Sequence, residues 1–132
     1  MRTTTMATLI FLAAGTALAK PPLRDVPEID DALFDVALAN EIRKNCSEIS
    51  ARIIKGLGYL RSLQNQAREL GYSDAEIEAY RTSDVEKDRM RRQGDVWLSA
   101  RGVDKEVEAD WCRVGRDEIS KSSRVGGLLR EN

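Results

Sequence analysis

Apolar residues recur at intervals of three and four along much of the chain, which is the spacing of one face of an α-helix. A single helix over residues 28–70 would be about 64 Å long, roughly twice the diameter expected for a domain of this size. We therefore expect a break at residues 45–47 (Asn-Cys-Ser), where short polar side chains compete with the helical backbone, between helices over 28–45 and 48–70. The stripe consists of Leu38, Ile42, Cys46, Ile49, Ile53, Leu57, Leu60, Ala67 and Leu70.

Two helix-capping patterns divide the next part of the chain. Segments 73–76 and 83–86 both fit Ser-x-x-Glu, in which the hydroxyl and the carboxylate each satisfy a backbone N–H at the start of a helix. These patterns predict helices over 74–82 and 84–101. Gly71 suits the left-handed position that ends the preceding helix.

The C-terminal part of the chain predicts one more helix. Gly102 ends the helix before it, and Asp104 is expected to cap a helix over 105–122. Gly126-Gly127 then predicts a loosely held C-terminus. Because no proline follows Pro27 and helix-favouring runs are long, the fold class is all-α: a small bundle of four to five helices, tied by one disulfide.

The N-terminus has the pattern of an export signal. Arg2 provides a positive charge, residues 7–19 are uncharged and mostly apolar, and Ala17-Leu18-Ala19 is the small-x-small pattern that signal peptidase cuts. As a helix, the apolar run would span about 20 Å, less than the roughly 30 Å hydrocarbon core of a bilayer. We expect a signal peptide over 1–19, cleaved between Ala19 and Lys20. A buried N-terminal helix and an uncleaved anchor are the alternatives.

Cleavage would leave a mature chain of two parts. Residues 20–27 contain the three prolines of the chain and are expected to form an extended leader. Residues 28–132 are expected to form a single helical domain. The mature chain has no second long apolar segment, so we expect a periplasmic or secreted protein without a stable membrane span.

Cys46 and Cys112 are the two cysteines of the chain. An even number of cysteines in an exported protein favours a disulfide, here one that pins the first pair of helices to the last helix. A redox pair, a metal pair and two buried thiols are the alternatives. The spacing lacks Cys-x-x-Cys, and a metal would need further soft ligands.

The composition excludes several kinds of chemistry. The 132 residues include no His, so the chain has no Ser-His-Asp triad, no His-ligated zinc and no imidazole acid or base. The formal net charge of −1 argues against a nucleic-acid partner, which requires an excess of basic residues. We predict no catalytic, cofactor-binding or metal-ligating residue.

Several patterns resemble functional motifs but have ordinary structural explanations. Residues 84–88 (Asp-x-Glu-x-Asp) begin like a calcium loop, but the Gly and Glu required further along are missing, so we expect a solvated helix face. Gly56 and Gly58 form an incomplete dinucleotide fingerprint and are better explained by close approach of two helices. The basic segment 87–92 is expected on an exposed helix face, with an anionic surface or acidic partner as the alternative.

Trp97 and Trp111 could anchor a binding surface, since Trp is enriched at interaction hot spots. Large aromatic side chains are more often mostly buried, and Trp111 adjoins Cys112. We therefore expect both in the core.

Four segments resemble a small family of exported alpha-proteobacterial proteins catalogued as a domain of unknown function. The resemblance implies a signal peptide, a helical domain and a pairing of Cys46 with Cys112; it implies no activity, substrate or catalytic residue. The segments are 42–46 (IRKNC), 70–77 (LGYSDAEI), 111–115 (WCRVG) and 125–130 (VGGLLR).

The leading functional hypothesis is a non-enzymatic, exported helical protein that binds a partner protein or an envelope component. It predicts neither the partner's identity nor an oligomeric state. An acid-responsive periplasmic chaperone is the alternative, because acidification would neutralise the many carboxylates and leave the basic groups uncompensated. A cell-wall hydrolase that uses an unmarked Glu is the third hypothesis.

Overall fold

The computed structural model describes residues 19–132, so the predicted signal peptide, apart from Ala19, lies outside the described residues. The described chain is mostly helical, which confirms the all-α bundle, with one two-stranded ribbon added. Its elements are the 3-10 turn η1 (Leu23–Asp25), α1 (Pro27–Asn45), β1 (Ile49–Ala51), α2 (Ile53–Glu69), α3 (Asp74–Thr82), α4 (Asp84–Ser99), α5 (Glu108–Ser120), α6 (Arg124–Gly127) and β2 (Leu129–Glu131).

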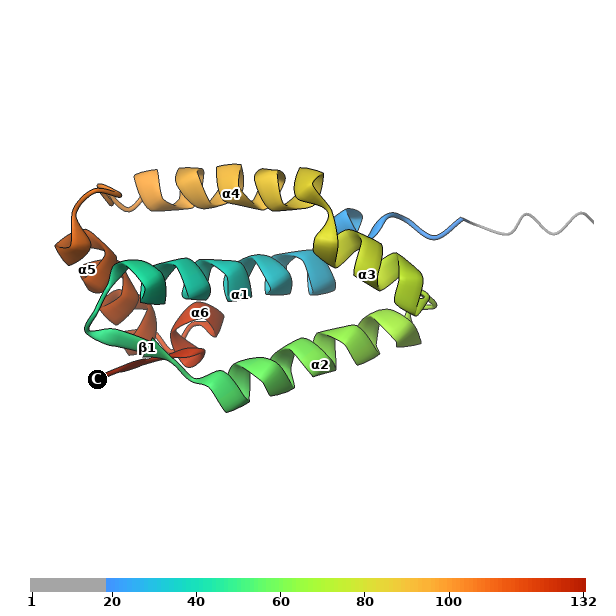
Figure 1. Cartoon of the computed structure of the whole chain (residues 1–132), viewed down its shortest axis with the longest axis horizontal. Coiled ribbons are helices and arrows are strands. Elements are labelled where there is room, and N and C mark those ends of the chain that lie inside the picture. Colours follow the sequence, from blue (N-terminus) through green and yellow to red (C-terminus); the bar gives the residue numbers. More distant parts are fainter. Residues whose placement is uncertain (1–18) are drawn as a thin grey trace, which may run out of the picture.

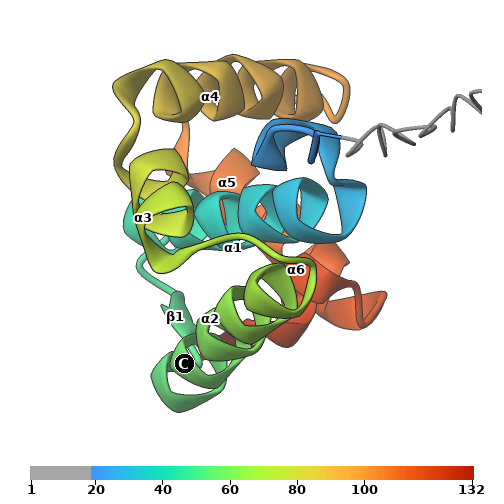
Figure 2. The ribbon, with the colours of Figure 1, turned by 90° about the vertical axis from the view of Figure 1, so that its right-hand side faces the viewer.

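The central element is α1, which contacts η1, α2, α4, α5 and α6. Helices α4, α1 and α2 lie side by side, with α1 in the middle, in both Figure 1 and Figure 2. The buried side chains form two clusters. The larger one joins α1 to α5, α6 and the ribbon and contains both cysteines, and the smaller one joins η1 and the start of α1 to the end of α2.

The predicted break after residue 45 is confirmed. The side-chain amide of Asn45 donates a hydrogen bond to the carbonyl of Glu41 at 2.8 Å, and α1 ends there. Cys46 follows with φ −130° and ψ 112°, an extended conformation. The chain therefore leaves α1 as a strand.

The helix predicted over 48–70 is wrong at its start, because residues 49–51 form β1. This strand pairs antiparallel with β2, with Ile49 opposite Glu131 and Ala51 opposite Leu129. The backbone N–H of Arg52 then donates to the carbonyl of Leu128 at 2.8 Å, and α2 begins at Ile53. Strand β2 therefore forms hydrogen bonds with backbone N–H and C=O groups that residues 49–51 would otherwise have used within a helix.

The first predicted capping box is complete. The hydroxyl of Ser73 accepts from the N–H of Glu76 at 3.1 Å, and the Glu76 carboxylate accepts from the N–H of Ser73 at 2.7 Å. The second box is half formed. Ser83 accepts from the N–H of Glu86 at 3.3 Å, but the Glu86 carboxylate turns toward arginines instead. Both helices nevertheless begin where the sequence predicts.

The last predicted helix is shorter than expected. Asp104 does not cap it: the Asp104 carboxylate accepts from the N–H of Glu106 at 2.9 Å, and α5 begins after Val107 and ends at Ser120. The prediction that Gly126-Gly127 loosens the C-terminus is also wrong. Gly126 is buried in α6, and a Cβ atom there would lie 1.9 Å from the carbonyl oxygen of Glu118. Close packing against α5 is what requires glycine.

Two further expectations are corrected. The leader is not wholly extended, because Leu23–Asp25 turn through η1 and bury Leu23. Gly56 and Gly58 do not mark a close helix approach, since a Cβ at either position would meet no atom within 4 Å. Each glycine therefore weakens α2 by about 1 kcal/mol relative to alanine.

These two kinds of glycine predict opposite responses to alanine. Gly126→Ala would force a methyl group onto the α5 backbone and lower the free energy of unfolding by about 2 kcal/mol. Gly56→Ala, in open space on α2, would raise it by about 1 kcal/mol. Urea unfolding followed by circular dichroism measures both. A Gly126→Ala variant as stable as the wild type would contradict the packing described.

Candidate functional site

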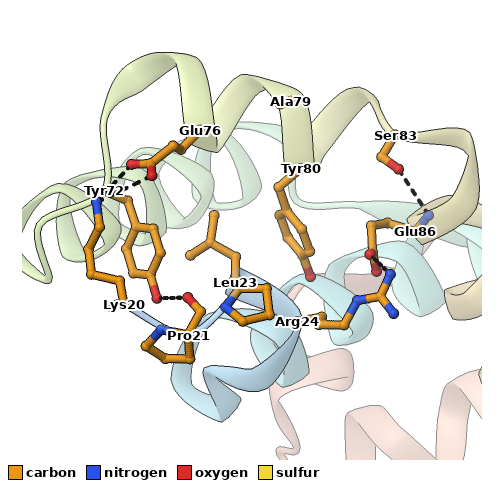
Figure 3. Close-up of a pocket in the computed structure, with 11 residues that line it drawn as sticks. Lys20, Pro21, Leu23, Arg24, Tyr72, Glu76, Ala79, Tyr80, Ser83 and Glu86 are labelled. Atoms are coloured by element: carbon orange, nitrogen blue, oxygen red, sulfur yellow. Dashed lines mark hydrogen bonds and ion pairs between the residues drawn. The ribbon is translucent and has the colours of Figure 1, made fainter. Parts of the chain in front are cut away.

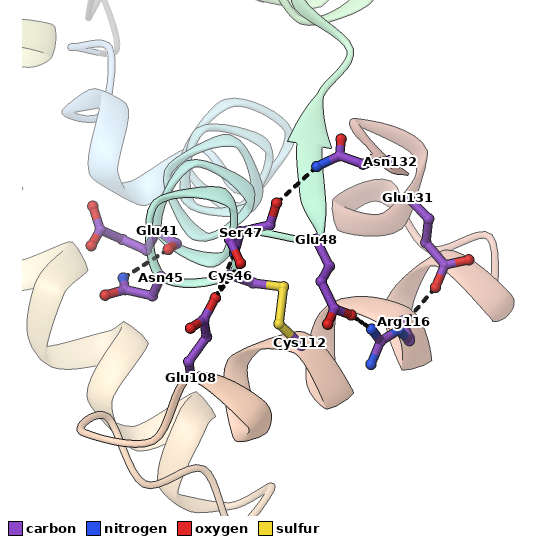
Figure 4. The surroundings of a disulfide bond; sticks show 10 residues. All are labelled: Glu41, Asn45, Cys46, Ser47, Glu48, Glu108, Cys112, Arg116, Glu131 and Asn132. Carbon is purple, nitrogen blue, oxygen red and sulfur yellow. Dashed lines mark hydrogen bonds and ion pairs between the residues drawn. A yellow bond between two sulfur atoms is a disulfide. The ribbon is translucent and has the colours of Figure 1, made fainter.

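Cys46, at the end of α1, and Cys112, on α5, form a disulfide with Cα atoms 5.1 Å apart (Figure 4). The predicted pairing is confirmed. The two residues are 1% and 4% exposed, so thiols in solution reach neither sulfur. The bond is therefore structural, which sets aside the redox and metal alternatives.

Polar contacts reinforce the chain next to the bridge. The backbone N–H and hydroxyl of Ser47 donate to the Glu108 carboxylate at 2.8 and 2.6 Å, and they hold the pKa of Glu108 below its ordinary value. Arg116 pairs with both Glu48 and Glu131. The end of α1, the start of α5 and the end of the chain therefore meet at one corner (Figure 4).

A pocket of about 520 Å³ lies where the leader crosses α3 and the start of α4 (Figure 3). The Lys20 ammonium donates to the carbonyl of Gly71 at 2.6 Å and pairs with Glu76 at 3.0 Å, while the Tyr72 hydroxyl donates to the carbonyl of Pro21. Lys20, the first residue after the predicted cleavage point, is thus held on α3. Ala19 is exposed beside it.

A cluster of ionic and polar side chains lies beside this pocket and shares lining residues with it. Arg89 of α4 pairs with Asp30 of α1 and, at 2.7 Å, with Glu86. Glu86 also pairs with Arg24 of η1, and the Tyr80 hydroxyl of α3 donates to Asp30. Burial, the hydrogen bond and the charge of Asp30 raise the pKa of Tyr80. The cluster joins η1, α1, α3 and α4.

The two glutamates of the pocket do not have the electrostatics of a general acid, which needs a raised pKa. The backbone N–H of Ser73, then Lys20, lowers the pKa of Glu76. Burial alone would raise the pKa of Glu86, but hydrogen bonds from Arg89 and Arg24 outweigh it and lower the pKa. At neutral pH both carboxylates are charged.

A different kind of surface follows the seam between α1 and α2. Two depressions of about 240 and 230 Å³ lie along it, and both are lined by Leu57 and Leu60 of α2. We call them together the α1–α2 groove. Leu57 is 52% exposed and Ile53 is 61% exposed, although both belong to the apolar stripe of the sequence. The other apolar lining residues are Leu23, Ile29, Leu33, Val36, Ala39, Ala51, Leu63, Ala67, Ile77, Tyr80 and Leu128.

The charged groups that line the groove are mostly positive: Arg43, Arg52, Arg61 and Arg81 against Glu78. Arg81 pairs with Glu78 at 2.7 Å. Arg43 donates to the side-chain oxygen of Asn40 and Arg52 to a backbone carbonyl, and neither these two nor Arg61 pairs with a carboxylate of residues 19–132. The groove therefore carries uncompensated positive charge.

A larger cleft of about 700 Å³ lies between α1 and α4. Its floor is apolar, with Phe34, Leu98 and Trp111 among the lining residues. Its charged lining residues are of both signs; for example, Lys105 pairs with Asp95 at 2.7 Å. The α1–α4 cleft thus lacks the charge bias of the groove.

The model of a protein family described as "Family of unknown function (DUF5333)" matches residues 21–130. The chain belongs to this family. The match confirms the resemblance seen in the sequence and covers the leader from Pro21 onward as well as helices α1 to α6. No curated protein and no solved structure is similar enough to this DUF5333 chain to count as a match.

Within residues 19–132 of this DUF5333 protein, no helix is both long and apolar enough to cross a bilayer. The same part of the chain brings no three His, Cys, Asp or Glu side chains together in a way that could hold a metal ion.

The remaining sequence predictions concern α4 and the two tryptophans. Residues 84–88 lie on α4, but Glu86 is buried rather than solvated. Of the basic segment 87–92, Arg89 is drawn into the ionic cluster. Trp111 is buried and donates its indole N–H to the carbonyl of Lys105, whereas Trp97 is partly buried under the Arg101 guanidinium, 3.6 Å from the ring centroid.

The sequence reasoning missed the α1–α2 groove. The apolar stripe contained a signal of the groove. It is longer than the stripe needed to give α1 (19 residues) and α2 (17 residues) one buried face each. Which stripe residues stay exposed depends on where α1 and α3 cover α2. Sequence periodicity does not encode that coverage.

The Cys46–Cys112 bond predicts a measurable stability difference. Replacing both residues by alanine would lower the free energy of unfolding by about 2–4 kcal/mol, because the bond closes a long loop in the unfolded chain. Denaturant unfolding of the oxidised wild type and the double variant measures the loss. The reduced wild type, as control, should unfold close to the double variant; equal midpoints for oxidised and reduced protein would contradict a stabilising role.

Proposed function

We propose that this protein is an exported, non-enzymatic binding protein whose α1–α2 groove docks a partner protein in the cell envelope. The exposed apolar side chains of the groove carry the proposal. Ile53, Leu57 and Leu60 are 61%, 52% and 37% exposed and recur at intervals of four and three along one face of α2. A contiguous apolar patch with a polar rim is typical of a protein-interaction surface.

Export is supported by the sequence pattern of residues 1–19 and by the disulfide, because such bonds persist mainly in oxidising compartments such as the periplasm. The exposed position of Ala19 and Lys20, at the start of the described chain, is compatible with cleavage between them. A binding role rather than catalysis is supported by the ion-paired state of the pocket carboxylates. A cell-wall hydrolase therefore has the least support of the three hypotheses.

Site-specific photocrosslinking in the native envelope tests the docking surface. A photoreactive amino acid in place of Leu57 is expected to capture a discrete partner, identifiable by mass spectrometry. Val96 of α4 is the matched control, since it is 71% exposed but lies outside the groove. Capture of the same species from both positions, or none from Leu57 in the folded, exported protein, would count against the proposal.

The ionic cluster of Arg24, Asp30, Tyr80, Glu86 and Arg89 favours a second candidate function, an acid-responsive periplasmic chaperone. Four elements meet at this cluster, and its two carboxylates are buried. Protonation of Glu86 would remove the charge that holds Arg24 and Arg89. The elements would then separate and expose apolar surface to client proteins.

The pKa of Glu86 sets the sign of the acid response. Since this pKa is lower in the folded protein than in the unfolded chain, the ion pairs contribute stability above the ordinary carboxyl pKa and lose it as pH falls through the folded value. Asp35 acts in the opposite direction: burial raises its pKa, so its protonation favours the folded state.

We expect the stability difference between wild type and Glu86→Gln to shrink as pH falls below about 4. Denaturant unfolding at a series of pH values measures it, with Glu69→Gln, at an exposed position on α2, as control. The chaperone function further requires that the wild type suppress aggregation of an acid-labile client at about pH 3. A chain that stays folded there, or loosens without suppressing aggregation, would remove this candidate.

A further inference from the structure

We infer that the α1–α2 groove binds an acidic amphipathic helix of a partner protein. This inference rests on the proposed function and adds the chemistry of the partner. The shape of the groove, its length and its charge each contribute one part of the argument.

The two depressions form one continuous seam. On α1, Ile29, Leu33, Val36 and Arg43 are spaced by four, three and seven residues, so they lie on one face of the helix. Helix α2 runs antiparallel to α1 (Figure 1), and the end of α2 at Ile53 lies with the end of α1 at Arg43. Both depressions share Leu57 and Leu60, which therefore connect the two halves.

The length of the seam matches a short helix. Residues 29–43 of α1 and 53–67 of α2 each rise about 21 Å, or about four helical turns. A third helix of about 14 residues fits such a seam, because its side-chain ridge packs into the groove between two helices at interaxial distances of about 8–10 Å. Its apolar side chains would recur at i, i+3 or i+4, and i+7.

The positive charge of the groove indicates a partner with negative charge. Four arginines and one glutamate line the groove, whereas the whole chain has a formal net charge of −1. Most cations elsewhere are ion-paired, for example Arg89, Arg116 and Arg124. Arg43, Arg52 and Arg61 are left to meet carboxylates of a partner, which would steer its approach and fix its orientation.

A concave site favours a helix over a lipid surface. Leu63 is buried at the base of the groove, and partly buried Leu33 and Val36 form its α1 wall. A bilayer surface is flat on this scale and would meet the exposed Ile53 and Ile54 but not the side chains between the helices. A protein helix reaches both.

Fluorescence anisotropy with a synthetic helical peptide tests the inference on the full mature chain. The peptide has about 15 residues, leucines on one face and glutamates beside them; a matched peptide carries lysine in place of every glutamate. We expect the acidic peptide to bind and the basic one not to. We expect Leu57→Ala and Arg61→Glu each to weaken binding about tenfold, with the effect of Arg61→Glu falling as salt rises.

Val96→Ala and Arg92→Glu, which change exposed residues of α4, are the matched controls and should leave affinity unchanged. Circular dichroism confirms that each variant is folded. Equal binding of both peptides, equal effects of groove and control substitutions, or no binding of the acidic peptide at about 1 mM would overturn the inference.

Two further measurements test the other possible occupants of the groove, a membrane surface and a second copy of the chain. Cosedimentation with anionic phosphatidylglycerol vesicles that is lost in Arg61→Glu, without peptide binding, would assign the groove to a membrane surface. Self-association that Leu57→Ala abolishes, again without peptide binding, would assign it to a second copy. A captured partner whose crosslinked segment is not an acidic helix would leave the proposed function standing and remove this inference alone.

Discussion

The disulfide between Cys46 and Cys112 holds the end of α1 against α5. Held against α5, the chain leaves α1 extended and pairs with the C-terminal strand before it can become helical again. The start of α2 is therefore set by contacts with residues about 80 positions away in sequence. The direction of α2, and with it the seam that α2 forms with α1, follows from this corner.

The distribution of charge gives the surface its polarity. Cations and carboxylates are close to equal in number, and most described cations are paired locally or across helices. At the junction of η1, α1, α3 and α4 the pairing is buried and joins four elements. Along α2 the pairing is incomplete beside exposed apolar side chains, which is a costly arrangement for a surface without a partner.

Local sequence signals predicted local features well. The break after Asn45 and the helix starts after Ser73 and Ser83 depend on hydrogen bonds between residues three or four apart, so nearby residue types are sufficient. The strand at residues 49–51 and the tight fit of Gly126 against Glu118 were not predictable in this way. They depend on partners that only the fold brings near.

The amino-acid sequence by itself determined the helical class and the approximate limits of the five longer helices, and it favoured the pairing of the two cysteines, because periodicity, caps and parity are properties of neighbouring or countable residues. The tertiary structure decided which face of α2 stays uncovered and which arginines lack a carboxylate. The exposed face of α2 and the unpaired arginines both depend on how α1 and α2 pack against each other. The α1–α2 groove is made of two helix surfaces that lie apart in the sequence, and only their packing brings them together.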